Sequence, residues 1–558
     1  MAIDLTPEQR ETGKANFQRV VGQFADPKSG VNRRDFMKGL VAAGAATGIS
    51  AAAYYGYDHA KLADRPVKAA LIGAGDEGGV LMGEHNPKYL EIIAVCDIRP
   101  SNQKRIFDGD PSPTSPRKGF NKVYGKEQAK KIKVFENYQQ MLKEMPEIEA
   151  VVIALPLHLH APVAIECMKQ GRHVLCEKLM AWNIAQCKDM IRVSEETDRI
   201  LCIGHQRHYS LLYAHAVDVM NSNVLGDIRH IRALWHRNNS QPMIKDGREV
   251  PGTIRDSWRP EIKPEDKAAL AEDKLKGYGY DGKKDKEGKW IVSPLEELVR
   301  WRLYNRTGGG LMAELGSHQL DACSIFLGKV HPLAVSGWGG KIFYKDDREV
   351  DDHVFVTFEF PGKNFYVRDN DGKPTHEIKD KEDIVVVTYS SINTNSFEGY
   401  GECVMGNRGT LIVQEEREAL LFPERGGAAA KSMSVSVVSA GGGAPVLSSD
   451  PSPGGPAAAA AAVTAGQASL GSGPPSRGYR EEMEHFAFCV RQHGEATSSE
   501  EKKKWRLEPR CHGKVAMADA IIALTSNQAM KQHQRIEFRP EWFDDKAKGV
   551  PDDLFNKA

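Results

Sequence analysis

Residues 71–79 read LIGAGDEGG, a glycine-rich turn that follows an apolar run beginning at Val67. Gly73, Gly75 and Gly78 form a GxGxxG pattern between a predicted strand and a predicted helix. In that setting glycine lets the backbone turn tightly and approach a pyrophosphate, whose charge the amino terminus of the helix stabilises. The pattern is weak alone, but after a strand and before a helix it predicts a dinucleotide site.

An acidic residue strengthens this prediction. Asp97 ends the next apolar run, EIIAVCD, nineteen residues after Gly78. A carboxylate there would accept the ribose hydroxyls of NAD and repel the 2′-phosphate of NADP. Arg99 lies close enough in the sequence to soften that repulsion. We therefore expect NAD in preference to NADP.

The apolar runs around the turn predict the fold class. Between Val67 and Leu201, runs of strand length alternate with helical patterns: VKAALIGAG, EIIAVCD, AVVIALP, HVLCEK and ILCIG. This alternation predicts a doubly wound parallel sheet, the Rossmann arrangement. After about Gln206 the runs become longer, with alternating β-branched and aromatic residues, as in HVFVTFEF. They predict a carboxyl-terminal α/β domain with a largely antiparallel sheet.

Composition divides the chain further. We expect an insertion at residues 263–290, rich in charge and glycine, to be a solvated surface segment. Residues 425–478 are rich in Gly, Ala, Ser and Pro, a composition that predicts a flexible loop. The predicted organisation is an export signal and linker at 1–60, a Rossmann domain at 61–205, a catalytic domain at 206–424, the loop at 425–478, and closing helices and a strand at 479–558.

The charge balance and the cysteines exclude some classes of protein. Lys and Arg total 75, as do Asp and Glu, which leaves no net field to attract nucleic acid or an anionic membrane. A small neutral substrate fits this balance better. The nine cysteines include no CxxC pair, so we interpret them as buried free thiols of a chain that folds in a reducing compartment.

An export signal precedes the predicted domains. Residues 32–38 read NRRDFMK, and a small-residue apolar run follows them to Ala53. The segment resembles a twin-arginine signal, whose machinery exports proteins already folded in the cytoplasm. It predicts a periplasmic or other extracytoplasmic location, with membrane anchoring if the signal stays uncleaved. The alternative is a basic helix start followed by an alanine-rich helix.

Two segments place polar residues at the carboxyl ends of adjacent predicted strands. They read ALPLHLHAP, at 154–162, and GRHVLCEKLMAWN, at 171–183. Doubly wound sheets bind their ligands at this edge. Lys178 could exchange a proton there if desolvation and a nicotinamide cation lowered its pKa. The alternative is an ordinary lysine at a strand end.

A third segment, RTGGGLMAELGSHQLDAC at 306–323, carries Glu314, His318 and Asp321. Their spacing of i, i+4 and i+7 would align them on one face of a helix. Such an array can fix one histidine tautomer while the other nitrogen exchanges a proton with a substrate hydroxyl. The alternative is the exposed side of a helix. No metal is predicted, because no second histidine or cysteine lies at ligand spacing.

Together the glycine turn, the CEK sequence and the GGGxxxExGxHxxD segment resemble the Gfo/Idh/MocA family from about Val67 to Pro540, except in the two insertions. The resemblance implies Lys178, Glu314 and His318 as catalytic residues, and a homo-oligomer. It implies cofactor contacts at Gly73, Gly75, Asp76, Glu77, Gly78, Asp97, Ile98, Arg99, Leu155, Pro156, His160, Glu177, Lys178 and Gln206. It implies substrate contacts at Lys178, Arg207, Trp301, Arg302, His318 and Asp321.

Two residues depart from the family pattern. Leu179 replaces the usual proline after the lysine, and Glu314 stands where aspartate is commoner. The first change affects the expected placement of Lys178, and the second lengthens the acid by one methylene.

The predicted function is hydride transfer between a hydroxyl-bearing carbon of a sugar, polyol or glycoside and a nicotinamide. His318, oriented by Glu314 and assisted by Lys178, would remove the hydroxyl proton. Because free NAD should be scarce outside the cytoplasm, an exported enzyme would carry it tightly bound. One alternative is a redox-neutral glycosidase, lyase or epimerase of the same superfamily, although the YPTH-type glycosidase signature is missing. Another is a non-catalytic dinucleotide- or sugar-binding protein.

Overall fold

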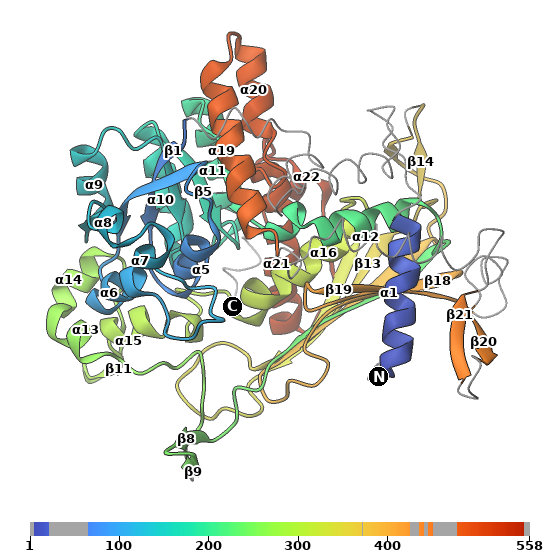
Figure 1. Ribbon diagram of the computed structural model, residues 1–558, viewed down its shortest axis with the longest axis horizontal. Helices are drawn as coiled ribbons and strands as arrows, with labels where there is room; N and C mark the ends of the chain where they lie inside the picture. Colours follow the sequence, from blue (N-terminus) through green and yellow to red (C-terminus); the bar gives the residue numbers. More distant parts are fainter. Residues whose placement is uncertain are drawn as a thin grey trace.

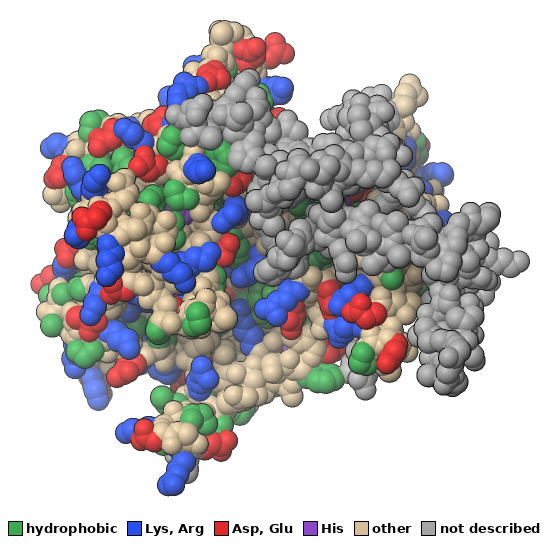
Figure 2. Space-filling view, viewed as in Figure 1, with side chains coloured by type: hydrophobic (Ala, Val, Ile, Leu, Met, Phe, Trp, Pro, Cys, Tyr) green, Lys and Arg blue, Asp and Glu red, His purple; other side chains and the backbone are tan. Residues whose placement is uncertain are grey.

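Two sheets organise the chain in the computed structural model (Figure 1). The structure describes residues 5–21, 65–250, 252–370, 372–424, 435–439, 445–449 and 477–551. Acidic and basic side chains alternate over the described surface of the face in Figure 2, as the balanced composition predicts.

The first sheet is parallel and has the strand order β3-β2-β1-β4-β5-β6. Helices cover both of its faces, so every residue of β4 is buried. This is the doubly wound Rossmann sheet that the sequence predicts. Its strands are β1 (Val67–Ile72), β2 (Leu90–Cys96), β3 (Lys133–Phe135), β4 (Ala150–Ile153), β5 (His173–Glu177) and β6 (Leu201–Gly204). Its helices are α5 (Asp76–Glu84), α6 (Pro100–Asp108), α7 (Phe120–Val123), α8 (Lys126–Ala129), α9 (Tyr138–Glu144), α10 (His160–Lys169) and α11 (Ile184–Thr197).

The second sheet has eight strands in the order β19-β18-β17-β7-β16-β13-β12-β22. Its pairs are antiparallel except β7 with β16. Burial alternates along much of β13, as expected for a sheet packed on one face. The strands are β7 (Ile228–His236), β12 (Ala334–Gly340), β13 (His353–Pro361), β16 (Ile384–Ile392), β17 (Tyr400–Gly406), β18 (Gly409–Gln414), β19 (Glu418–Pro423) and β22 (Ile536–Glu537).

Helices near the carboxyl terminus join the two sheets. Helix α19 (Tyr479–Glu495) packs against α5 and strands of the first sheet, and α21 (Gly513–Gln532) contacts α11 and β12. Between them lies α20 (Ser499–Leu507), and α22 (Pro540–Phe543) follows. Helices α12 (Leu211–Asn221) and α16 (Ser317–Phe326) pack with the second sheet. The sheets therefore share one continuous core.

The insertion expected to be solvated is folded. It contains α13 (Pro264–Ala269), α14 (Glu272–Gly277), β10 (Lys283–Lys284) and β11 (Trp290–Val292), and α15 (Pro294–Val299) follows it. Leu270, Leu275 and Tyr280 pack with Leu298 and Val299 in a small separate core. Most residues of the insertion are exposed, as predicted for a surface segment. It is ordered because these few apolar residues, scattered among charges, converge in space.

Helix α1 (Pro7–Val21) lies within the segment predicted to be a signal and linker. Phe17 and Val20 are buried, and the Asn16 amide donates a hydrogen bond to the carbonyl of Leu421 in β19 at 3.1 Å. The start of that segment is therefore docked on the second domain. The twin arginines lie outside the described residues. Within the described ranges, no helix is long and apolar enough to cross a membrane.

Short strand pairs complete the described structure: β8 (Met243–Lys245) with β9 (Arg248–Val250), β14 (Tyr366–Arg368) with β15 (Pro374–Ile378), and β20 (Val435–Ser439) with β21 (Pro445–Ser449). The last pair falls within the predicted flexible loop, whose other residues, up to 476, lie outside the described ranges. All nine cysteines are buried and unpaired, as predicted.

Candidate functional site

The glycine turn between β1 and α5 keeps a space open. Gly73 has a φ of +96°, and a Cβ there would lie 2.3 Å from the carbonyl oxygen of Ala154. A Cβ on Gly78 would lie 2.1 Å from the Gly73 carbonyl oxygen, whereas one on Gly75 would meet nothing within 4 Å. Two glycines therefore let the turn form, and the third leaves room for a pyrophosphate at the helix amino terminus. The turn fits a dinucleotide.

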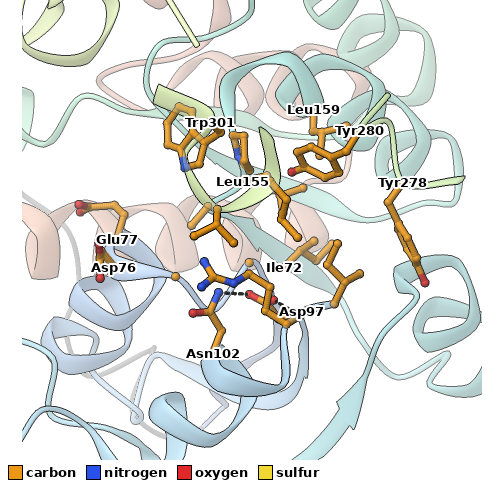
Figure 3. A pocket seen from close by; sticks show the side chains of 18 of the residues that line it. Ile72, Asp76, Glu77, Asp97, Asn102, Leu155, Leu159, Tyr278, Tyr280 and Trp301 are labelled. Atoms are coloured by element: carbon orange, nitrogen blue, oxygen red, sulfur yellow. Dashed lines mark hydrogen bonds between the residues drawn. The ribbon is translucent and has the colours of Figure 1, made fainter. Parts of the chain in front are cut away.

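A cleft of about 740 Å³ begins at this turn, a size typical of cofactor sites. The carboxyl edge of the first sheet forms one wall, and residues 257–302 supply most of the opposite wall (Figure 3). Most predicted cofactor residues line it: Gly73, Gly75, Asp76, Glu77, Asp97, Ile98, Arg99, Leu155, Pro156, Glu177 and Lys178.

Asp97 sits at the end of β2 with its carboxylate held in place. Its Oδ2 accepts hydrogen bonds from the Ala74 N–H at 2.8 Å and the Asn102 amide at 3.1 Å, and its Oδ1 accepts from the Arg99 N–H at 2.8 Å. Burial raises the pKa of Asp97, and these donors oppose that rise. The Arg99 guanidinium pairs instead with Asp266, with Nη2 and Oδ2 2.9 Å apart. Arg99 thus lines the cleft while its guanidinium is paired with a buried carboxylate.

The other end of the cleft contains Lys178, Arg302 and Glu314. Lys178 Nζ donates to the backbone carbonyl of Glu314 at 2.8 Å, and Arg302 Nε donates to the Glu314 carboxylate at 2.7 Å. Burial would raise the pKa of Glu314, but the nearby Lys178 and Arg302 charges lower it overall. Glu314 is therefore an anion bound between two cations.

Glu314 lies in a π-helical turn (Met312–Gly316), and His318 and Asp321 lie in α16, which follows it. Glu314 bonds to Arg302, and no hydrogen bond joins it to His318 in the described part of the chain. The predicted orientation of His318 by Glu314 was therefore wrong.

His318 lies on α16 and is 7% exposed. Its Nδ1 is buried without a hydrogen-bond partner, and its ring centroid is 5.5 Å from that of Trp235. Burial first, and then the charge of Lys178, hold the pKa of His318 well below its usual range. The imidazole is therefore neutral at neutral pH and can accept a proton.

Asp321 does not reach the cleft as a substrate contact. It is fully buried, and it accepts from His208 Nε2 at 2.8 Å and Lys329 Nζ at 2.7 Å. Burial would raise the pKa of Asp321, but His208 and Lys329 lower it strongly. Two groups of metal-ligand type lie here, one of His208, Cys511 and Asp519 and one of His205, Asp321 and Asp519. The Lys329 ammonium lies between two of their acids, 2.7 Å from Asp321 and 3.6 Å from Asp519, and supplies positive charge there.

Arg207 and Gln206 also lie away from the cleft lining. Both are 1% exposed. Arg207 forms buried ion pairs with Glu402 and Glu416, each at 2.8 Å. Arg207 Nη1 also donates to the backbone carbonyl of His318 at 2.7 Å. The structure therefore places Arg207 behind the predicted site, where it positions the start of α16 and cannot touch a substrate in the cleft.

His160 and Gly78 support the cleft from outside its lining. His160 is 2% exposed, with Nδ1 2.8 Å from the Leu179 carbonyl oxygen and Nε2 2.8 Å from that of Leu155. It thus ties together the loops after β4 and β5. The predicted substrate residues Trp301 and Arg302, by contrast, do line the cleft.

Three carboxyl groups cluster beside the glycine turn: Glu77 and Glu177, which line the cleft, and Glu482 of α19, which is buried. Burial raises the pKa of each, and the neighbouring acids raise those of Glu177 and Glu482 further. Among the described residues, neither side-chain oxygen of Glu482 has a hydrogen-bond partner.

The sequence analysis missed most of the opposite wall. Trp258, Tyr278 and Tyr280 line the cleft but lie at no recognisable spacing. The aromatic residues of GYGYDG, at 277–282, were the one available signal, because such residues are unusual in a solvated charged segment.

Two segments of the chain match models of known protein families. Residues 67–205 match the model of the Gfo/Idh/MocA oxidoreductase family NAD-binding Rossmann fold. Residues 289–370 match the Gfo/Idh/MocA carboxyl-terminal domain. The first matched segment contains the glycine turn, Asp97 and Lys178, and the second contains Arg302, Glu314 and His318.

Three curated proteins are similar to part of the chain, at 22% to 32% identity. An uncharacterised oxidoreductase of Rhizobium meliloti is 32% identical over 169 residues, 30% of this chain and 45% of that protein. Inositol 2-dehydrogenase of Salmonella paratyphi B is 22% identical over 191 residues, 34% of this chain and 51% of that protein. A glycosyl hydrolase family 109 protein of Stenotrophomonas maltophilia is 27% identical over 175 residues, 30% of this chain and 36% of that protein. The chain spans about half or less of the length of these Gfo/Idh/MocA relatives.

A solved structure shares the overall fold. The inositol dehydrogenase homologue from Azotobacter vinelandii, crystallised with NADH and myo-inositol, superposes with a TM-score of 0.53 at 12% identity. The match covers 85% of this chain and 98% of that one. It shows that the two proteins share a fold over most of this chain.

Proposed function

We propose that the chain is an NAD-dependent oxidoreductase that acts on a hydroxyl-bearing carbon of a sugar, polyol or glycoside. One observation carries the proposal: a single cleft joins an open glycine turn and Asp97 at one end to Lys178, Arg302 and Glu314 at the other. The first end suits a dinucleotide, and the second offers proton-transfer and hydrogen-bonding groups. A bound nicotinamide would supply the hydride acceptor.

His318 is the proposed base. It is 7% exposed and lies behind the cleft lining, next to Lys178, so a substrate hydroxyl would have to reach it past that lysine. Burial and the Lys178 charge lower its pKa, which favours the neutral imidazole that a base requires. Arg207 holds the backbone at His318 from behind. Lys178, fixed to the Glu314 carbonyl, would donate a hydrogen bond to the same hydroxyl and stabilise charge that develops on its oxygen.

Trp301 and Arg302 are the proposed substrate contacts. The Arg302 guanidinium carbon lies 4.4 Å from the centre of the Trp301 ring, so the two present one flat, polar-edged surface. Such a surface suits the mixed apolar and hydroxyl faces of a carbohydrate. Glu314 fixes Arg302 from the other side.

A redox-neutral reaction is the second candidate. It is favoured by the resemblance to a glycosyl hydrolase family 109 protein. In that case the base, the lysine and the cofactor would keep their roles, and a second hydride transfer would return the electrons.

The test is an activity screen of the purified full-length protein. Inositols, aldoses, alditols and methyl glycosides would be added with NAD, while nicotinamide absorbance and the products are followed. Net NADH formation supports the dehydrogenase, and new products without NADH support the redox-neutral alternative. Failure of NAD to bind the folded protein would contradict both.

We also propose export by the twin-arginine route. The proposal is supported by Arg33 and Arg34 before a small-residue apolar run. Replacing both by lysine should keep the protein in the cytoplasm, as measured by cell fractionation. Unchanged location of that variant would contradict it.

A further inference from the structure

We propose that residues 257–302, which we name the outer wall, hold the adenosine half of the dinucleotide and keep it bound between turnovers. The inference rests on the proposed function, because it assumes that the cleft takes a dinucleotide. It goes further by assigning cofactor retention to a segment outside the Rossmann domain.

Asp266 anchors the outer wall to the first domain. It is fully buried although it is an acid in a charged segment. Its Oδ1 accepts from the Ser101 N–H at 3.0 Å, and its Oδ2 accepts from the Ser101 hydroxyl at 2.7 Å and from Arg99 Nε at 2.9 Å. These partners begin α6, directly after the strand that carries Asp97. The anchor therefore lies beside the expected ribose position.

Two more contacts fix the outer wall to neighbouring loops. Lys274 pairs with Glu136, just after β3, with Nζ and Oε2 2.8 Å apart. The Tyr280 ring meets the edge of His158, just after β4, with centroids 5.3 Å apart. In a Rossmann sheet the loops after the second and third strands flank the adenosine. The outer wall thus bridges the mouth of the adenosine half of the cleft.

The cleft side of the outer wall is aromatic. Tyr278 and Tyr280 line it, and Figure 3 shows both across the cleft from Asp97 and Ile72. Tyr280 is 2% exposed and belongs to the small core of the insertion, so it fixes this part of the wall. Tyr278 is partly exposed, and a flat ring with a polar edge suits contact with a purine base. The geometry thus supplies a binding surface and an anchor in the same segment.

Retention follows from how a nucleotide would leave. The adenosine half lies between the sheet edge and the outer wall, so release requires the Asp266 anchor to open first. A requirement of this kind lowers the dissociation rate more than it changes the chemical step. An exported enzyme with little free NAD around it would need this property.

The test compares Asp266→Ala with Asp273→Ala in the full-length protein. Asp273 lies in the same segment, but its side chain is fully exposed and 3.8 Å from Lys276. Bound NADH is chased with excess NAD, and the loss of its fluorescence gives the dissociation rate. We expect Asp266→Ala to release NADH about tenfold faster, the effect of losing charge-assisted hydrogen bonds. We expect Asp273→Ala to match the unmodified protein.

The outcomes separate the two proposals. If the unmodified protein binds NADH and Asp266→Ala releases it at the same rate, retention by the outer wall is overturned and the proposed function stands. If the unmodified protein binds no nicotinamide dinucleotide, both are overturned. If Asp266→Ala fails to fold, Tyr278→Ala replaces it: faster release supports the proposal, and unchanged release overturns it.

Discussion

The two walls of the cleft are built differently. The Rossmann wall consists of turns at the ends of parallel strands, and it offers backbone N–H groups, two packed glycines and the fixed carboxylate of Asp97. The outer wall consists of short helices around a small core of its own, tied to the first domain by Asp266 and Lys274. The difference suggests that the first wall sets where the cofactor lies and the second sets how long it stays.

The largest effect expected is on the chemical step. His318→Ala removes the proposed base, so turnover should fall about 100- to 10,000-fold. NADH affinity should not change, because His318 lies outside the cleft lining. Steady-state rates and an NADH titration measure the two quantities, with His230→Ala on β7 as the control. A variant that keeps its turnover would remove His318 from the mechanism.

A pair of glycine variants tests the Rossmann wall. Gly78→Ala places a Cβ 2.1 Å from a carbonyl oxygen, so it should lower stability by about 1–3 kcal/mol. Gly75→Ala meets open space and should leave the melting temperature of the cofactor-free protein unchanged while weakening NAD binding. Thermal melts with and without NAD measure both. Equal melting temperatures for the two variants would contradict this account of the turn.

Cofactor choice should depend on Asp97. Asp97→Asn keeps the shape but removes the charge, so NAD should bind about tenfold more weakly while NADP loses a repulsive neighbour. The ratio of the two dissociation constants is the measurement. An unchanged ratio would show that another residue sets the preference.

The smallest effect expected concerns Glu482, behind the Rossmann wall. Its pKa is raised well above 4.5 by burial and by Glu177 and Glu77, so the folded state holds the proton more tightly than the unfolded state. That stabilisation is complete below pH 4.5 and is lost as the pH rises toward the folded pKa. Glu482→Gln should therefore raise the melting temperature more at about pH 8 than at about pH 5. A gain that does not grow with pH, or an equal gain from Glu500→Gln on α20, would contradict it.

Local patterns made the Rossmann wall predictable, because the strands, the glycine turn and Asp97 follow one another within about 30 residues, as the βαβ unit requires. The catalytic segment was predicted only in part. The π-turn at Met312–Gly316 and the ion pair between Arg302 and Glu314 were not predicted. No pattern in the residues around it indicated that turn.

Distant contacts were not predictable. Arg207 is buried because Glu402 and Glu416 neutralise it from 195 and 209 residues away. The contacts that hold the outer wall were not predictable for the same reason. From the sequence, Asp266 is expected to be a surface charge, because its partners Arg99 and Ser101 lie 167 and 165 residues away.

The most direct test of the central claim is a crystal structure of the protein grown with NADH. We predict the adenosine ribose beside Asp97, the pyrophosphate over Gly75 and the nicotinamide ring beside Lys178 and Glu314, with the outer wall closed over the adenine. An empty cleft at saturating NADH, or a nucleotide bound elsewhere, would contradict the account.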